Sequence, residues 1–123
     1  MTGEEIVSMI LMLVFCAGFG FACLGIGAAA QRSNKPFGFW THKVVKPEQI
    51  MDIAAYNREN AKMWKGYSLW YFAAAFLQLL NPLHSFFAIL AMIQVLLGCT
   101  VGIWLLIKTY QRILKNHEVS REP

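Results

Sequence analysis

Charged side chains are missing from two long stretches of this 123-residue chain. Residues 6–30 and 66–107 contain no Asp, Glu, Lys or Arg, and charged residues make up only 15% of the whole sequence. A typical soluble domain carries about 25%. Because about 20 helical residues cross the hydrocarbon core of a bilayer, uncharged apolar runs of this length are typical of membrane spans. The two stretches therefore predict an integral membrane protein, with the lipid bilayer as its first partner.

Basic residues are absent from the first 31 positions, where the only charges are Glu4 and Glu5. A signal peptide needs a basic start and a much shorter apolar segment, so the first run is expected to remain as a span. All eleven Lys and Arg lie between the two runs or after the second one. That distribution argues against nucleic-acid binding, and by the positive-inside rule it predicts a multi-pass protein with its N-terminus outside and its C-terminus cytoplasmic.

The sequence also lacks the patterns of reactive and metal-binding sites. Its three cysteines form no CxxC pair, its three histidines are isolated from one another, and no GxSxG, HExxH, Walker or GxGxxG pattern occurs. No ionisable carboxylate, Lys or Arg lies inside the apolar runs, although a proton relay normally needs one. We therefore expect no cofactor, no metal site and no enzymatic activity.

The second run is too long for one crossing. Its 42 residues would extend about 63 Å as a helix, twice the hydrocarbon thickness. Asn81 and Pro82 interrupt it, and proline disfavours helix at its own position and at the preceding residue. The prediction is a single all-α membrane domain with three transmembrane helices at about 6–30, 66–80 and 83–107, the last two forming a hairpin, and a cytoplasmic tail at 108–123.

The segment 31–65 is predicted to be a cytoplasmic loop followed by an amphipathic helix that begins at Pro47 and continues into the second span. Asn57 lies on the apolar face of that helix, and a polar amide there needs a hydrogen-bond partner. The backbone around Gly38 is a candidate, which would fold the aromatic loop against the helix as a small cap. The alternative is a helix that lies on the headgroups with Asn57 hydrated. The candidate interaction surface comprises Phe37, Gly38, Phe39, Trp40, Tyr56, Asn57 and Asn60.

Two stripes of small residues run along the first predicted span, and small residues allow helices to approach closely in lipid. Both stripes could face the hairpin of the same chain, or one could face a second subunit or another protein. Near the middle of the third span, Gln94 is expected to make an interhelical hydrogen bond close to Trp70 and Tyr71; a contact with a pore or substrate is the alternative. The two stripes are Gly18, Ala22, Gly25 and Ala29, and Cys16, Gly20, Cys23 and Gly27.

The order of Pro36, Phe37, Gly38, Phe39 and Trp40, followed by Tyr56, Asn57 and Trp64, resembles a group of small uncharacterised three-span membrane proteins of Gram-positive bacteria. The organisation is also distantly similar to the SdpI-like immunity proteins, in which an Arg-containing loop follows a span. This chain has no Arg in residues 38–41. The resemblance implies a protein of a bacterial plasma membrane, of immunity type, and supplies no reaction.

These features favour a non-enzymatic protein that binds another membrane protein or a peptide. The alternative is a subunit of a small oligomeric channel or transporter, which would form a homo-oligomer. A membrane enzyme is the third hypothesis, and no residue pattern calls for it.

Overall fold

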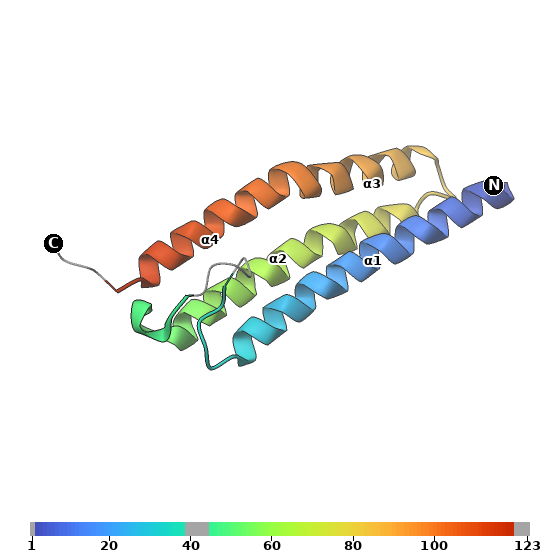
Figure 1. The fold of residues 1–123 in the computed structure, drawn as a ribbon. Coiled ribbons are helices and arrows are strands. Elements are labelled where there is room, and N and C mark those ends of the chain that lie inside the picture. The colour runs from blue at the N-terminus through green and yellow to red at the C-terminus, as the bar shows by residue number, and fades with distance from the viewer. Residues whose placement is uncertain (1, 39–44, 120–123) are drawn as a thin grey trace.

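The computed structural model describes residues 2–38 and 45–119. This part of the chain is all-helical, and its only strand-like pairing is an isolated bridge between Ile50 and Glu118. Figure 1 shows α2 lying between α1 on one side and the long helix formed by α3 and α4 on the other. In chain order the elements are α1 (Gly3–Arg32), η1 (Pro47–Gln49), α2 (Ile53–Leu79), α3 (Phe86–Leu97), η2 (Gly98–Gly102) and α4 (Ile103–His117).

Helix α1 begins earlier than its apolar run because the preceding residues form a capping box. The Thr2 hydroxyl accepts the backbone N–H of Glu5 at 3.2 Å, and the Glu5 carboxylate accepts the N–H of Thr2 at 3.1 Å. These bonds satisfy two of the amides that a helix start leaves unpaired. The negative charge of Glu5 also suits the positive end of the helix dipole.

The helix expected to begin at Pro47 begins instead at Ile53. Pro47 starts only the single 3₁₀ turn of η1. The next backbone groups bond to the C-terminal segment: Met51 N–H donates to the His117 carbonyl at 2.9 Å. Asp52 then caps α2 by accepting the N–H of Ala55 at 3.1 Å. Backbone pairing with the C-terminal segment therefore holds Ile50 in an extended conformation, and the long helix starts only after it.

From Ile53 to Leu79, α2 is one continuous helix, so the predicted amphipathic helix and the predicted short second arm are two halves of a single element. It is about 40 Å long at 1.5 Å per residue. The helix ends before Asn81 and Pro82, where the sequence predicts the turn, and α3 begins at Phe86 rather than at Leu83.

Beyond α3, the backbone passes through the π-helical segment η2 without leaving the helix axis and continues as α4 to His117. A π turn shifts hydrogen bonds by one residue and leaves carbonyls in need of donors. Side chains of α2 donate here: the Tyr67 hydroxyl donates to the Gly98 carbonyl at 2.7 Å, and Trp70 Nε1 donates at 2.6 Å to the Gln94 carbonyl, which also accepts the backbone N–H of Gly98. The wide turn is thereby stabilised by the neighbouring helix.

Two helices, Gly3–Arg32 and Phe86–His117, are long and apolar enough to cross a membrane. Their most apolar 18-residue windows have mean hydropathies of 2.5 and 2.3, yet only 17% of each window is buried within the chain. The core helix of a water-soluble protein would be mostly buried. The low burial therefore agrees with helices whose apolar faces are covered by lipid.

Candidate interaction site

The first functional candidate is a small folded cap, which we define as residues 33–37 held against Tyr56 and Asn57 of α2. The side chain of Asn57 makes three hydrogen bonds to this loop. Its Oδ1 accepts the N–H of Phe37 at 2.8 Å, and its Nδ2 donates to the carbonyls of Ser33 and Lys35 at 3.1 and 2.8 Å. Asn57 is only 1% exposed. The partners of the amide are therefore backbone groups of the loop at Ser33, Lys35 and Phe37, just before the expected position at Gly38.

Tyr56 ties the same loop to the last helix. Its hydroxyl contacts the Phe37 carbonyl at 2.5 Å and the Tyr110 hydroxyl at 3.0 Å. Burial, and then the hydrogen bond with Tyr110, raise the pKa of Tyr56 well above its ordinary value. A neutral phenol can donate to the loop, whereas a phenolate could only accept. The cap is therefore assembled with Tyr56 protonated throughout the physiological pH range.

The end of α4 and the tail complete this region. His117 Nε2 lies 2.8 Å from a carboxylate oxygen of Glu59, and the backbone N–H of Val119 donates to the Gln49 carbonyl at 2.7 Å. Around Tyr56 and Tyr110, an apolar cluster also contains Ile50 and Ile113. Segments separated by more than 50 residues in sequence thus form one structure at this end of the molecule.

The burial of the predicted surface residues divides them into two groups. Tyr56 and Asn60 are fully buried, and Asn60 Nδ2 donates to the Tyr56 carbonyl at 3.0 Å. Together with Asn57 they position the loop, and they have no surface left for a partner. Phe37 is half-buried and Gly38 is exposed. Two further members of the predicted surface, Phe39 and Trp40, lie outside the described residues.

Of the two small-residue stripes on α1, only one packs within the chain. Cys16, Gly20, Cys23 and Gly27 are buried. A Cβ added to Gly27 would lie 3.0 Å from the backbone carbonyl oxygen of Ala61, so α1 and α2 touch here through their backbones. The other stripe is exposed, and a Cβ at Gly18 or Gly25 would meet nothing within 4 Å. Gly18, Ala22 and Gly25 therefore have open space beside them in the described chain, and packing at this stripe stays a prediction.

The interhelical hydrogen bond expected at Gln94 is present. Gln94 Nε2 donates to the Trp70 carbonyl at 2.8 Å, while the indole N–H of Trp70 donates to the Gln94 carbonyl. Gly98 makes this approach feasible, since a Cβ there would lie 2.8 Å from the Trp70 ring. Gln94 therefore has the structural role of joining α2 to α3.

Two residues that matter in the structure received no role from the sequence. One is Tyr110, because nothing local in the sequence indicates its contact with Tyr56. Gln78 lies in the run 66–80, and its side chain is only 4% exposed. The signal that singled out Gln94, an amide within an apolar stretch, applies equally to Gln78 and could have identified it.

Comparison with family models, curated proteins and solved structures gives no match to this chain. Across residues 2–38 and 45–119 there is also no group of three His, Cys, Asp or Glu side chains that could hold a metal ion. The functional argument therefore depends on the chain's own geometry.

Proposed function

We propose that the chain is a three-span integral protein of a bacterial plasma membrane that binds another membrane protein or a peptide, and that it is not an enzyme. The observation that carries the membrane part is the combination of two long apolar helices with little internal burial. Helices α1 and α3 run in the same direction, so α2 must bring the chain back between them. If both long helices cross the bilayer, connectivity requires α2 to cross as well.

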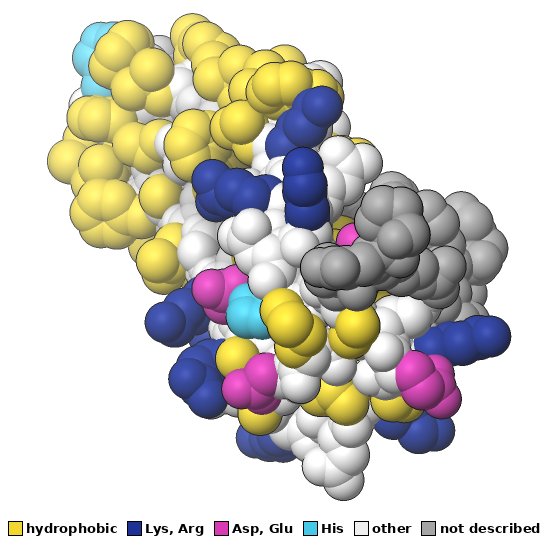
Figure 2. Space-filling model, turned by 90° about the vertical axis from the view of Figure 1, so that its left-hand side faces the viewer, with side chains coloured by type: hydrophobic (Ala, Val, Ile, Leu, Met, Phe, Trp, Pro, Cys, Tyr) yellow, Lys and Arg dark blue, Asp and Glu magenta, His cyan; other side chains and the backbone are white. Residues whose placement is uncertain are grey.

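The distribution of charge supports an orientation with the cap in the cytoplasm. The loop after α1, the start of α2 and the end of α4 all lie at one end of the molecule, and this is the end with the basic side chains. Figure 2 views that end and shows Lys and Arg side chains over it, with apolar side chains behind. By the positive-inside rule this end faces the cytoplasm, while the N-terminus and the turn at Asn81 and Pro82 face outside.

Binding is favoured over catalysis by the way the polar side chains of the cap are used. The side chains of Asn57 and Tyr56 form their hydrogen bonds with the loop backbone. A rigid cap next to anionic lipid headgroups suits recognition of a partner in the same membrane. The exposed members of the described loop are Ser33, Asn34, Lys35 and Gly38.

Reporter fusions test the orientation directly. Fusions after Met51 and after Pro123 should report a cytoplasmic position, and a fusion at Leu83 should report an external one. Export of the fusion after Met51 would overturn the proposed orientation.

The binding role is tested by affinity purification from native membranes in mild detergent. A foreign protein or peptide in stoichiometric amount supports it, whereas a pure homo-oligomer or a bound chromophore contradicts it. Parallel purification of Asn57→Ala and of the exposed-asparagine control Asn116→Ala shows whether the cap is the contact surface. Partner loss in the first variant alone would assign the contact to the cap.

A further inference from the structure

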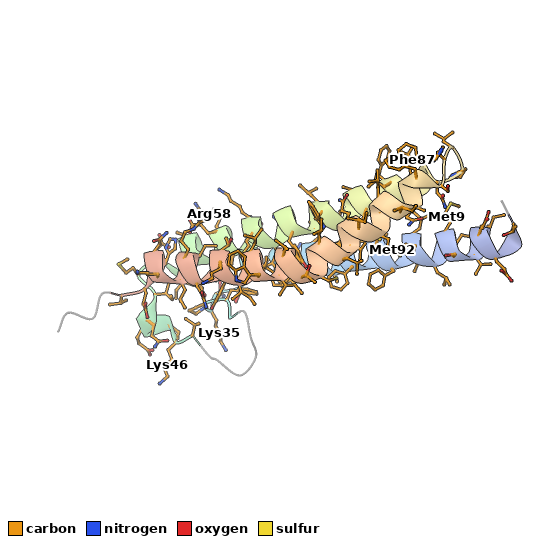
Figure 3. All side chains as sticks on the ribbon, turned by 90° about the horizontal axis from the view of Figure 1, so that it is seen from above. Met9, Lys35, Lys46, Arg58, Phe87 and Met92 are labelled. Carbon is orange, nitrogen blue, oxygen red and sulfur yellow. The ribbon has the colours of Figure 1, made fainter. Side chains whose placement is uncertain are left out.

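A second surface lies at the opposite end of the molecule, as a groove between α1 and α3. Its volume is about 1660 Å³. Leu11 and Phe15 line it from α1, Ile89 and Met92 line it from α3, and Gln78 of α2 contributes to its lining between them. Figure 3 labels Met9 and Met92, which both line the groove, on the half of the molecule away from Lys35 and Arg58. The groove is therefore separate from the cap.

Gln78 is the feature that distinguishes this groove from an ordinary lipid-facing surface. Gln78 is only 4% exposed, and its side chain makes no hydrogen bond with any described residue. Its amide atoms are not among the fully enclosed polar atoms that lack a partner, so they reach the groove that Gln78 lines. An amide that is removed from water without a partner is costly. In a bilayer, the only open direction for this amide is the groove, so an occupant with a hydrogen-bonding group satisfies it. A lipid acyl chain has no such group.

The dimensions of the groove match a helix. The groove follows α1 from Thr2 to Phe15, which is about 20 Å or four helical turns at 1.5 Å per residue. The α1 wall follows one helical face through Glu4, Ser8, Leu11 and Phe15. The same face continues with Gly18, Ala22 and Gly25, which are exposed and leave room for a neighbouring backbone.

The charges at the outer mouth of the groove indicate which helix fits. Glu4 and Glu5 line this mouth and are exposed. A second copy in the same orientation would bring its own Glu4 and Glu5 to this level. It could supply no Lys or Arg, since the first of these in the chain is Arg32, at the opposite end of α1; the basic side chain that it would bring to this end is His84, which already lines the groove. The complementary occupant is a helix of another polypeptide with Lys or Arg at its outer end.

We propose that this groove binds one apolar, membrane-spanning helix of a different polypeptide, with Lys or Arg facing Glu4 and Glu5 and a polar side chain at the depth of Gln78. Gln78 lies one turn beyond Ala74, and Ala74 contacts Cys16 of α1. The depth of Gln78 therefore corresponds to Met12, about 10 Å or seven residues inward from Glu5. The recognised pattern is a basic end followed about seven residues later by Ser, Thr or Asn.

The proposal rests on the proposed membrane insertion, and it is tested with defined synthetic peptides in lipid nanodiscs. The probe is a Leu/Ala helix of about 20 residues with two Lys at one end and Ser about seven residues inward. Two matched peptides replace the Lys pair by Glu or the Ser by Leu. A photo-crosslinking residue is placed at Met92 in the groove and, as a control, at Phe76, which is exposed on α2 and does not line it.

We expect position 92 to crosslink the Lys and Ser peptide roughly fivefold better than the Glu-ended peptide, and better than position 76 does. The double variant Glu4→Lys with Glu5→Lys should reverse the preference for peptide charge. Gln78→Leu should abolish the preference for Ser over Leu while leaving the protein folded. Equal crosslinking of all peptides, crosslinking to lipid alone, or a crosslinked dimer of the chain would each overturn the proposal.

These outcomes are distinct from a failure of the proposed function. If the peptides do not bind while purification from native membranes still yields a stoichiometric partner, the groove proposal is wrong and the binding role stands. If the chain does not insert into nanodiscs, both are wrong.

Discussion

The two ends of this molecule differ in how their buried polar groups find hydrogen-bond partners. At the end with the basic residues, polar groups of the loop are paired within the chain: Asn57 bonds three loop groups, and Tyr56 joins the loop to Tyr110. The exception at this end is Oδ1 of Asn60, which is buried without a hydrogen-bond partner among the described residues. At the other end, α1 and α3 both pack on α2 but leave a groove between them, and the buried amide of Gln78 has no partner among the described residues.

The difference shows how a chain of three long helices distributes its limited polar contacts. The cap has a loop and a tail that reach back to the helices, so donors and acceptors meet. The opposite end has only the short connection from Leu79 to Phe86, which cannot cover α1 as well. One end is closed by its own loop and tail, and the other is open and acidic. The two ends can therefore be tested separately.

The largest effect is expected from opening the closed end. Asn57→Ala removes three hydrogen bonds and leaves buried backbone groups of the loop unpaired, which should lower the free energy of unfolding by about 2 to 4 kcal/mol. Thermal unfolding in detergent and protease cleavage of the loop at 33–38 measure it. The control is Asn116→Ala, because Asn116 is an asparagine with an exposed side chain. Glu59 on α2 would be a poorer control, since its carboxylate contacts His117. Identical behaviour of the two variants would show that the cap does not order the loop.

The next comparison concerns the two faces of α1. Gly27→Ala places a Cβ against the Ala61 carbonyl, so the helices must separate, and we expect a loss of about 1 to 3 kcal/mol in unfolding free energy. Gly25→Ala meets open space and should leave the stability of the isolated chain unchanged. Thermal unfolding of both variants in detergent checks this. An equal loss in both would mean that the exposed stripe is also packed.

A smaller effect is expected from Tyr56→Phe, which removes two hydrogen bonds worth together about 1 to 2 kcal/mol. Because burial raises the pKa of Tyr56, its neutral form stabilises the fold below the ordinary tyrosine pKa of 10, and this contribution is lost as pH rises above 10. The stability difference between the wild type and Tyr56→Phe should therefore narrow above pH 10. Unfolding measured from pH 7 to 11 tests it, and a constant difference would argue against the buried phenol.

The smallest effects are expected from the two amides within the apolar helices, half-buried Gln94 and buried Gln78. Gln94→Leu breaks a satisfied pair with Trp70 and should lower the unfolding free energy by about 1 kcal/mol or less. Gln78→Leu removes an unpaired amide and should leave stability unchanged or slightly raised. Unfolding in the same detergent compares them. A larger loss for Gln78→Leu would mean that this amide has a partner within the chain.

Several of these features could be predicted because they depend on local chemistry. The uncharged runs determine the length of α1, and Asn81 with Pro82 determines where α2 ends. The need of Asn57 for a partner could also be inferred, since a polar residue on an apolar helical face is costly if unpaired. The start of α2 could not, because it depends on backbone pairing between Met51 and His117, which are 66 residues apart.

By itself, the sequence determines that the chain is helical, apolar over most of its length and basic at one end. Helix propensity, hydropathy and charge are properties of each residue and its near neighbours. Only the tertiary structure decides which small-residue stripe is buried and which is free. The two stripes have the same residue types at the same helical spacing. Which of them is buried depends on the rotation of α1 about its axis against α2. The tertiary structure also decides the surroundings of the two amides. Helix packing places Gln94 beside the carbonyl of Trp70, and it places Gln78 at the groove.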